Sequence, residues 1–203
     1  MNDPNNTKEK VIRCAIDLFA TKGFRGTSIR DIASAMGMSI SNIYHYFGSK
    51  EGLLLAILQH SSEDLVKELR EAAQLDIPPM ERFRKLIETH VRLSERYNNE
   101  AKIFFLDEEH LSEEGAKVNR HIQRQIYGFY KQVLRELEDA GLIQYRSIKV
   151  LAFNIFGIIN WQFRWYRSDG SLSMEEIREE IVSFIMNGVL AGAWAQGNGE
   201  DVS

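Results

Sequence analysis

Apolar residues recur at intervals of three and four along almost the whole of the 203-residue chain, and this spacing limits the fold more than any other feature. Side chains at i, i+3, i+4 and i+7 share one face of an α-helix, whereas a half-buried strand needs strict alternation of apolar and polar residues. Almost no stretch of the chain alternates in that way. The sequence therefore predicts an all-α protein of about nine helices.

Proline, glycine and capping residues divide this pattern into segments. The clearest break is Ile77-Pro78-Pro79, because the residue before a proline is pushed out of helical geometry. Ser173 and Glu176 form a capping box that opens the last helix. The expected helices cover residues 7–23, 28–36, 39–47, 50–74, 80–97, 101–108, 112–140, 147–167 and 173–194. Three short helices thus precede longer ones, which predicts a small domain over 1–52 and a helical bundle over 53–203.

Charge is distributed unevenly along the chain. The net charge of −4 argues, taken whole, against a nucleic-acid partner. Residues 1–60, however, contain seven basic and five acidic side chains, whereas the remainder contains 18 basic and 24 acidic ones. Any contact with a polyanion is therefore expected in the N-terminal third.

Residues 27–53 carry the most specific pattern in the chain. Two short helices joined by a turn at Gly37 are typical of a helix-turn-helix. Ile40, Ile43 and Phe47 should fix the second of these helices to the core, which leaves its polar residues facing outward. Such residues can read base edges in the major groove, and flanking residues can hold phosphates. A structural three-helix unit with a polar outer face would show the same pattern.

The residues expected to contact DNA fall into three groups. Those on the outer face of the second short helix are candidates for base contacts: Ser41, Asn42, Tyr44 and His45. Those that flank it are candidates for phosphate contacts: Arg25, Thr27, Tyr46 and Lys50. Ser39 caps the same helix and completes the set.

This stretch resembles the helix-turn-helix of the tetracycline-repressor (TetR) family of bacterial transcription regulators. The matching residues are Thr27, Ile32-Ala33, Gly37, Ser39, Tyr44, Tyr46-Phe47, Lys50-Glu51 and Leu53. The chain departs from the family pattern at Met36, Met38 and Ser41, where smaller residues are common. The resemblance implies a homodimer whose two recognition helices enter successive major grooves of a palindromic operator. It also implies repression that a small ligand in the C-terminal domain relieves.

A second, shorter resemblance concerns residues 160–177. The stretch is similar to the end of the helix that precedes the last one in TetR-type regulators of fatty-acid and steroid catabolism, whose ligands are acyl-CoA thioesters. Such a ligand needs cations for its phosphates and aromatic rings for its adenine, for which Trp161, Arg164, Trp165 and Arg167 are candidates. Its acyl chain needs an apolar tunnel. Candidates for that tunnel are Ile103, Phe104, Phe105, Ile155, Phe156 and Ile159.

The same C-terminal helices also suit dimerisation, which leaves two interpretations of their aromatic residues open. Tryptophan, tyrosine and arginine are enriched at protein interfaces, and aromatic residues at helical spacing are common in cores. The apolar stripes are broad enough to serve both their own bundle and a partner. The residues concerned are Val150, Phe153, Ile158, Ile181, Phe184, Ile185, Val189 and Leu190.

Other classes of function find little support. The chain has a single cysteine, Cys14, no pair of histidines at metal-binding spacing, and no phosphate-loop, dinucleotide or hydrolase motif. We therefore expect no enzyme activity, no metal and no cofactor. The N-terminus lacks the features of a signal peptide, and the longest apolar stretch, 150–163, is too short to span a membrane. A cytoplasmic regulator is expected. A regulator of efflux or stress that responds to hydrophobic drugs is the alternative to one that responds to acyl-CoA.

Overall fold

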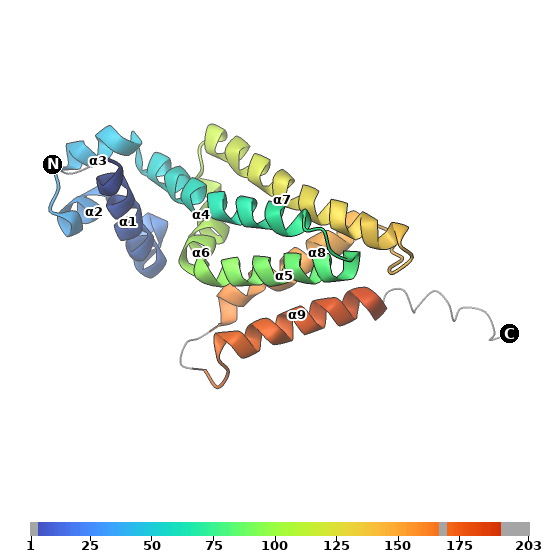
Figure 1. Cartoon of the computed structure of the whole chain (residues 1–203). Coiled ribbons are helices and arrows are strands. Elements are labelled where there is room, and N and C mark those ends of the chain that lie inside the picture. Colours follow the sequence, from blue (N-terminus) through green and yellow to red (C-terminus); the bar gives the residue numbers. More distant parts are fainter. Residues whose placement is uncertain (1–3, 167–169, 192–203) are drawn as a thin grey trace. The chain divides into compact units, whose positions relative to one another are not determined.

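The structure is a computed structural model that describes residues 4–166 and 170–191, without the side chains of 4, 5, 101, 104–108, 163 and 191. All regular structure in this part is helical, which confirms the expected all-α class (Figure 1). The elements are α1 (Pro4–Gly26), α2 (Ile29–Met36), α3 (Ile40–Phe47), α4 (Lys50–Ala73), α5 (Pro79–Arg96), α6 (Asn98–Asp107), the 3-10 turn η1 (Glu108–His110), α7 (Glu113–Asp139), α8 (Ile148–Trp165) and α9 (Met174–Ala191).

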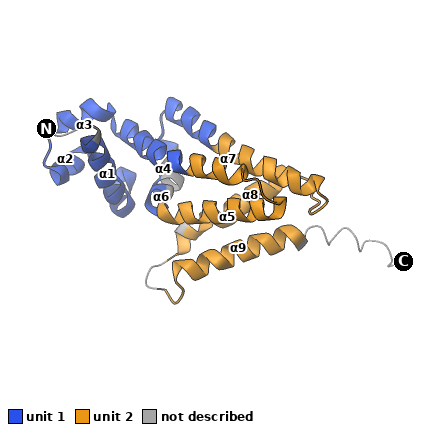
Figure 2. Ribbon diagram, viewed as in Figure 1, with its two compact units in different colours: residues 1–64, 97–122 blue, residues 65–96, 123–203 orange. Residues whose placement is uncertain are grey.

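The chain forms two compact units (Figure 2). Unit 1 consists of residues 1–64 and 97–122, and unit 2 of residues 65–96 and 123–203. This division does not coincide with the expected boundary at residue 52, because α4 runs from one unit into the other and α6 belongs with the N-terminal helices. A boundary drawn along the sequence cannot show that a later helix returns to an earlier core.

Unit 1 is built around α1, which packs against α2 and along α6. Its core joins Phe19 of α1, Ile43 of α3 and Leu53 of α4, and it includes Ile103 from α6. Each of these side chains is nearly or fully removed from solvent, and burial of one such side chain contributes roughly 1.5–3 kcal/mol. Helix α3 therefore contributes Ile43 and Phe47 to a core that it shares with α1, α2, α4 and α6.

The junction between α1, α2 and α3 depends on local capping. Ser28 caps α2, since its hydroxyl accepts from the amide of Asp31 at 3.1 Å while the Asp31 carboxylate accepts from the amide of Ser28 at 2.7 Å. Hydrogen bonds to the Asp31 carboxylate from the Ser28 hydroxyl, at 2.7 Å, and from the Ser28 amide lower the pKa of Asp31. Gly37 ends α2 in the left-handed conformation, with φ 61°, which glycine adopts at little cost. The tight turn to α3 follows directly from these residues.

Unit 2 contains α5, α8 and α9, the end of α4 and most of α7. α5 packs against both α8 and α9, and α8 packs against α9. The core is mostly aliphatic, with Phe83 from α5, Leu134 from α7, Ile155 from α8 and Ile185 from α9. No described helix is long and apolar enough to cross a membrane.

Candidate nucleic-acid interface and ligand region

The recognition helix α3 separates its residues into two faces. Ile43 and Phe47 are buried in the core of unit 1, whereas the base-contact candidates Ser41, Asn42, Tyr44 and His45 are all exposed. Tyr44 is 48% exposed, so its side chain is available for contacts outside the unit. Ile40 was expected in the core but is exposed, because it is the first residue of the helix and lies at its end.

Ser39 fixes where this helix begins. Its hydroxyl accepts a hydrogen bond from the amide of Asn42 at 3.2 Å, so it satisfies one of the amides that the first turn leaves unpaired. The residue is exposed and lies beside the outer face of α3. Its geometry is that of a cap that could also touch a phosphate. Tyr46, by contrast, is half-buried, packs against the core of unit 1, and lies edge-on to His45 at 5.6 Å between ring centroids.

Thr27 is placed differently from the expectation. It is only 1% exposed, and its hydroxyl donates to the carbonyl oxygens of Gly23 at 3.0 Å and Leu18 at 3.2 Å. Its hydroxyl therefore stabilises the bend at the end of α1 and is not presented to a phosphate. The sequence pattern predicts a phosphate contact for Thr27, whereas its side chain is hydrogen-bonded inside the unit.

Lys50 and Arg25 already have partners within unit 1. The Lys50 ammonium donates to the carbonyl oxygen of Phe24 and lies 4.1 Å from the centroid of its ring. The Arg25 guanidinium pairs with the Glu109 carboxylate at 3.3 Å and donates from Nε to Nε2 of His110 at 3.1 Å. Phosphate contacts by either residue would have to add to these interactions or replace them.

Glu109 and His110, which the sequence did not single out, contact the end of α1. His110 also stacks on Phe24 with 5.2 Å between centroids. Nothing in their own sequence neighbourhood indicates this, because the contact joins segments 85 residues apart. Within the described residues no group of three or more histidine, cysteine, aspartate or glutamate side chains could hold a metal ion.

In unit 2, Phe156 is part of a cluster of aromatic rings drawn from three helices. Its ring lies edge-on to Tyr130 of α7 at 4.8 Å and to His90 of α5 at 5.9 Å. It also contacts Phe153, which stacks on Tyr127. The rings pass from exposed Phe153 to fully buried Tyr130, so Phe156 joins the surface of the unit to its interior.

His90 and Tyr130 form a polar pair inside this apolar core. The two rings are joined by a hydrogen bond of 2.9 Å between His90 Nδ1 and the Tyr130 hydroxyl. Burial lowers the pKa of His90 to about 4 and raises that of Tyr130, so both groups are neutral at pH 7. The sequence signal for this pair was a histidine within the apolar stripe of α5, beside Leu86, Ile87 and Val91.

The residues expected to hold a CoA nucleotide lie at the end of α8. Trp161 is 60% exposed, Trp165 is exposed, and the Arg164 guanidinium lies 5.5 Å from the Trp161 ring. Arg167 lies outside the described residues, as do the side chains of Phe104 and Phe105. Of the other tunnel candidates, Ile103 is buried in the core of unit 1, whereas Ile155 and Ile159 are buried in that of unit 2. They do not line one tunnel within either unit.

The apolar stripes of α8 and α9 are divided by the structure into inward and outward residues. Ile181, Ile185 and Val189 are buried in the core of unit 2, and Ile158 is partly buried against it. The other residues of the stripes are exposed, as are Trp161 and Trp165 of α8, and together they are named the outer apolar face: Val150, Phe153, Trp161, Trp165, Phe184 and Leu190. Phe184 alone is 66% exposed. Exposed apolar side chains on two helices that pack together are typical of a protein–protein interface.

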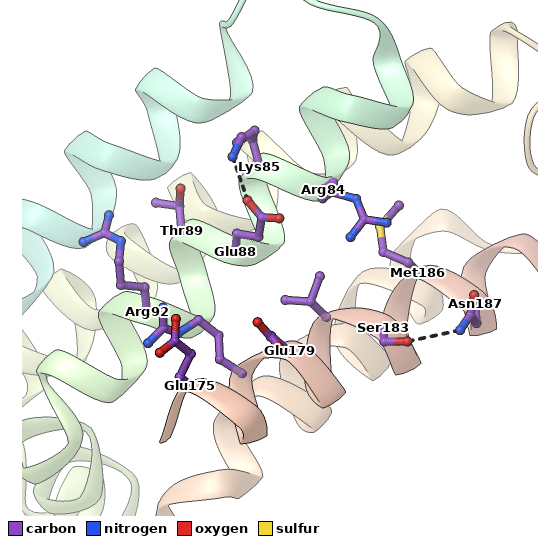
Figure 3. A pocket seen from close by; sticks show the side chains of 12 residues that line it. Arg84, Lys85, Glu88, Thr89, Arg92, Glu175, Glu179, Ser183, Met186 and Asn187 are labelled. Carbon is purple, nitrogen blue, oxygen red and sulfur yellow. Dashed lines mark hydrogen bonds and ion pairs between the residues drawn. The ribbon is translucent and has the colours of Figure 1, made fainter. Parts of the chain in front are cut away.

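A groove of about 570 Å³ runs between α5 and α9 in unit 2 (Figure 3). Charged side chains of both signs line it, and several are paired, as Lys85 is with Glu88 at 2.9 Å and Arg178 is with Glu95 at 3.2 Å. Val182 and Met186 are its apolar residues. This polar lining does not suit the apolar part of a hydrophobic ligand.

Comparisons with known proteins agree with this arrangement. A family model described as "Bacterial regulatory proteins, tetR family" matches residues 11–57, and one described as "Tetracyclin repressor-like, C-terminal domain" matches residues 76–189. The transcriptional repressor KstR2 of Rhodococcus jostii is 25% identical over 184 residues, which is 90% of each chain.

Two solved structures are similar over most of the chain. The TetR family transcriptional regulator PfmR from Thermus thermophilus has a TM-score of 0.81 and 26% identity, and the match covers 88% of this chain and 97% of PfmR. AibR in complex with isovaleryl coenzyme A and operator DNA has a TM-score of 0.79, the same identity and the same coverage.

The fold and the two-faced α3 define an all-α protein with an N-terminal helix-turn-helix. The chain belongs to the TetR family of bacterial regulatory proteins, since the C-terminal model alone matches more than half of it. It is therefore a transcriptional regulator and not an enzyme.

Proposed function

We propose that the protein is a homodimeric repressor that binds a palindromic operator through α3 and releases it when a small hydrophobic ligand, an acyl-CoA, binds unit 2. The observation that carries the DNA-binding part is the division of α3 into a buried apolar face and an outer face of Ser41, Asn42, Tyr44 and His45. Polar side chains on a rigid helix that is fixed from behind are what base reading in the major groove requires.

The phosphate contacts are assigned to a smaller set than the sequence predicted. Arg25, Ser39, Tyr46 and Lys50 remain in it, and Thr27 does not, because its hydroxyl is buried. Lys50 is the first residue of α4 and Arg25 is in the last turn of α1, so the two cations come from different helices of unit 1. Phosphate contacts supply most of the affinity that does not depend on sequence, and they weaken with salt.

The outer apolar face of α8 and α9 is assigned to a second copy of the chain. Its exposed residues would be covered in a dimer, and an interface of four helices, two from each copy, is the arrangement that the family resemblance implies. The assignment accounts for Phe184 and Leu190, which have no role inside unit 2. Under this assignment Phe153, whose side chain is exposed on the same face, belongs to the dimer interface and not to a ligand site.

An acyl-CoA is the proposed ligand because of two observations. AibR, which is similar over 88% of this chain, is known in complex with isovaleryl coenzyme A. At the end of α8, Trp161 and Arg164 offer an exposed ring beside a guanidinium, which suits the adenine and the phosphates of CoA. Trp161 and Trp165 also lie on the outer apolar face, so a CoA bound there would lie at the edge of the dimer interface.

The proposed mechanism uses two conformations of the dimer. Ligand in unit 2 changes the position of α4, which is the helix that both units share. The separation of the two recognition helices then no longer matches the groove repeat of ~34 Å. Operator DNA and the small ligand each weaken the binding of the other by the same factor, because the coupling between two binding sites is reciprocal.

A selection of genomic fragments by the purified protein tests this proposal, at low salt, with and without decanoyl-CoA. Enrichment of a palindromic site that disappears with decanoyl-CoA supports the whole proposal. Enrichment that persists with acyl-CoA but ends with a hydrophobic drug would favour the regulator of efflux or stress. No enrichment under any condition would overturn the DNA-binding role.

A further inference from the structure

The polar groups buried in unit 2 differ in whether they have hydrogen-bond partners. His90 and Tyr130 are bonded to each other, through a hydrogen bond of 2.9 Å between His90 Nδ1 and the Tyr130 hydroxyl. Gln162 of α8 is equally buried, at 3% exposure, but its Nε2 has no hydrogen-bond partner among the described residues. An unpaired buried amide costs about 1–3 kcal/mol, so natural cores rarely keep one without a reason.

Gln162 lies at the end of the apolar row that faces the interior of unit 2. Ala152, Ile155 and Ile159 precede it on the same side of α8, at helical spacing, and all three are buried. A glutamine is the last member of a row that is otherwise aliphatic. A leucine or methionine would fill the same volume without leaving a donor unpaired.

The other two buried atoms without hydrogen-bond partners belong to a side chain that is paired through another atom and to a residue that is only half-buried. Nε of Arg178 belongs to a side chain that is already paired with Glu95, and Asn98 is a half-buried residue at the start of α6. Gln162 Nε2 is therefore the atom among these three that belongs to a nearly fully buried residue. This unpaired donor lies on the inward side of α8, on the same side as the buried aliphatic residues of the row.

We propose that Gln162 donates a hydrogen bond to a carbonyl oxygen of the ligand that binds in the interior of unit 2, and so selects carbonyl-bearing ligands over plain alkyl ones. The inference rests on the proposed function, because it requires a hydrophobic ligand in this unit. The carbonyl is either that of the thioester or a keto group farther along the acyl chain. Gln162 is chosen over His90 and Tyr130 because each of these two is already hydrogen-bonded to the other.

Three probes separate these sources: decanoyl-CoA, 9-oxodecanoyl-CoA and the thioether S-decyl-CoA, which keeps the CoA moiety but has no carbonyl at the thioester position or along its alkyl chain. Binding is measured by calorimetry on the full chain, without DNA. A site built to donate a hydrogen bond rejects an analogue without the acceptor strongly. We expect decanoyl-CoA or 9-oxodecanoyl-CoA to bind at least tenfold more tightly than S-decyl-CoA. Because 9-oxodecanoyl-CoA also carries the thioester, equal affinities of the two carbonyl compounds identify the thioester carbonyl as the acceptor, and tight binding of 9-oxodecanoyl-CoA alone identifies the keto group.

The variant Gln162→Leu should reduce this preference to less than threefold and leave thermal stability unchanged or raised, since it removes an unpaired donor from an apolar site. Gln123→Leu, at an exposed position of α7, is the matched control and should keep the preference. Tyr130→Phe should lower stability but also keep the preference.

Two results would contradict the inference alone: a wild-type protein that binds S-decyl-CoA as tightly as both carbonyl compounds, or an undiminished preference in Gln162→Leu. A wild-type protein that binds none of the three probes would instead overturn the acyl-CoA ligand class, and the inference with it.

Discussion

Units 1 and 2 use their polar residues in opposite ways. In unit 1 the polar residues proposed for function lie on the outside of α3, while the interior is apolar and holds that helix in place. In unit 2 the distinctive polar residues, His90, Tyr130 and Gln162, lie inside, and the outside of α8 and α9 is apolar. The difference fits the proposed roles, in which unit 1 presents a rigid surface to DNA, and unit 2 binds a hydrophobic ligand and packs against a second copy of the chain.

The largest effect is expected from a charge on the outer apolar face. Phe184→Asp places a carboxylate where the second copy is proposed to pack, so the dimer should dissociate at micromolar concentration and operator binding should fall at least 100-fold. The free energy of unfolding of the monomer should change little, because Phe184 is exposed. Sedimentation velocity and fluorescence anisotropy measure the two effects. A variant that remains a dimer would remove this face from the interface.

Acid should destabilise unit 2 through His90. In the folded protein the pKa of this buried imidazole is about 4, whereas it is ~6.5 in the unfolded chain. The stability that depends on neutral His90 is therefore fully present above pH ~6.5 and is lost as the pH falls toward 4, by about 3 kcal/mol. Denaturant unfolding of wild type and His90→Phe between pH 7 and 4 measures the difference. Parallel pH profiles would show that His90 does not titrate as described.

Loss of a base contact should weaken operator binding by roughly 10–100-fold, or about 1–3 kcal/mol. Tyr44→Ala tests this on the outer face of α3, where the exposed ring contributes little to folding. Gln59→Ala, at an exposed position of α4, is the control for truncation of a polar side chain in the same unit. Equal operator affinities of the two variants, measured by anisotropy, would contradict the assignment of α3 as the recognition helix.

The smallest effect concerns the partners of Arg25. Glu109→Gln removes the carboxylate that pairs with this guanidinium, so Arg25 becomes more available to phosphate and operator affinity should rise by up to about fivefold. The gain is small because an exposed ion pair contributes only ~0–1 kcal/mol. The affinity should also fall more steeply with salt than that of wild type. An unchanged affinity and salt slope would exclude Arg25 from the phosphate contacts.

Much of unit 1 could be predicted from the sequence because its signals are local. The caps at Ser28 and Ser39, the turn at Gly37 and the spacing of Ile43 and Phe47 each act within a few residues. The buried hydroxyl of Thr27 could not be predicted, because the position of its acceptors depends on how α1 bends at Gly23, whose φ is 75°.

Less of unit 2 could be predicted because its helices are apolar on more than one side. The sequence of α8 shows that Val150, Phe153 and Ile155 are hydrophobic, but only packing shows that Ile155 faces inward and the other two outward. The unpaired donor of Gln162 was missed for the same reason, since a glutamine near the end of a helix is usually solvated. The return of α6 to the core of unit 1 depends on contacts far apart in sequence.

The most direct test measures the coupling between operator and acyl-CoA in both directions, on an operator recovered by selection. Anisotropy gives the dissociation constant of the operator with and without saturating decanoyl-CoA, and calorimetry gives that of decanoyl-CoA with and without operator. Both dissociation constants should rise by the same factor, at least fivefold, because the coupling between two sites is symmetric. If decanoyl-CoA binds and the operator affinity does not change, the proposed release of DNA by ligand in unit 2 is contradicted.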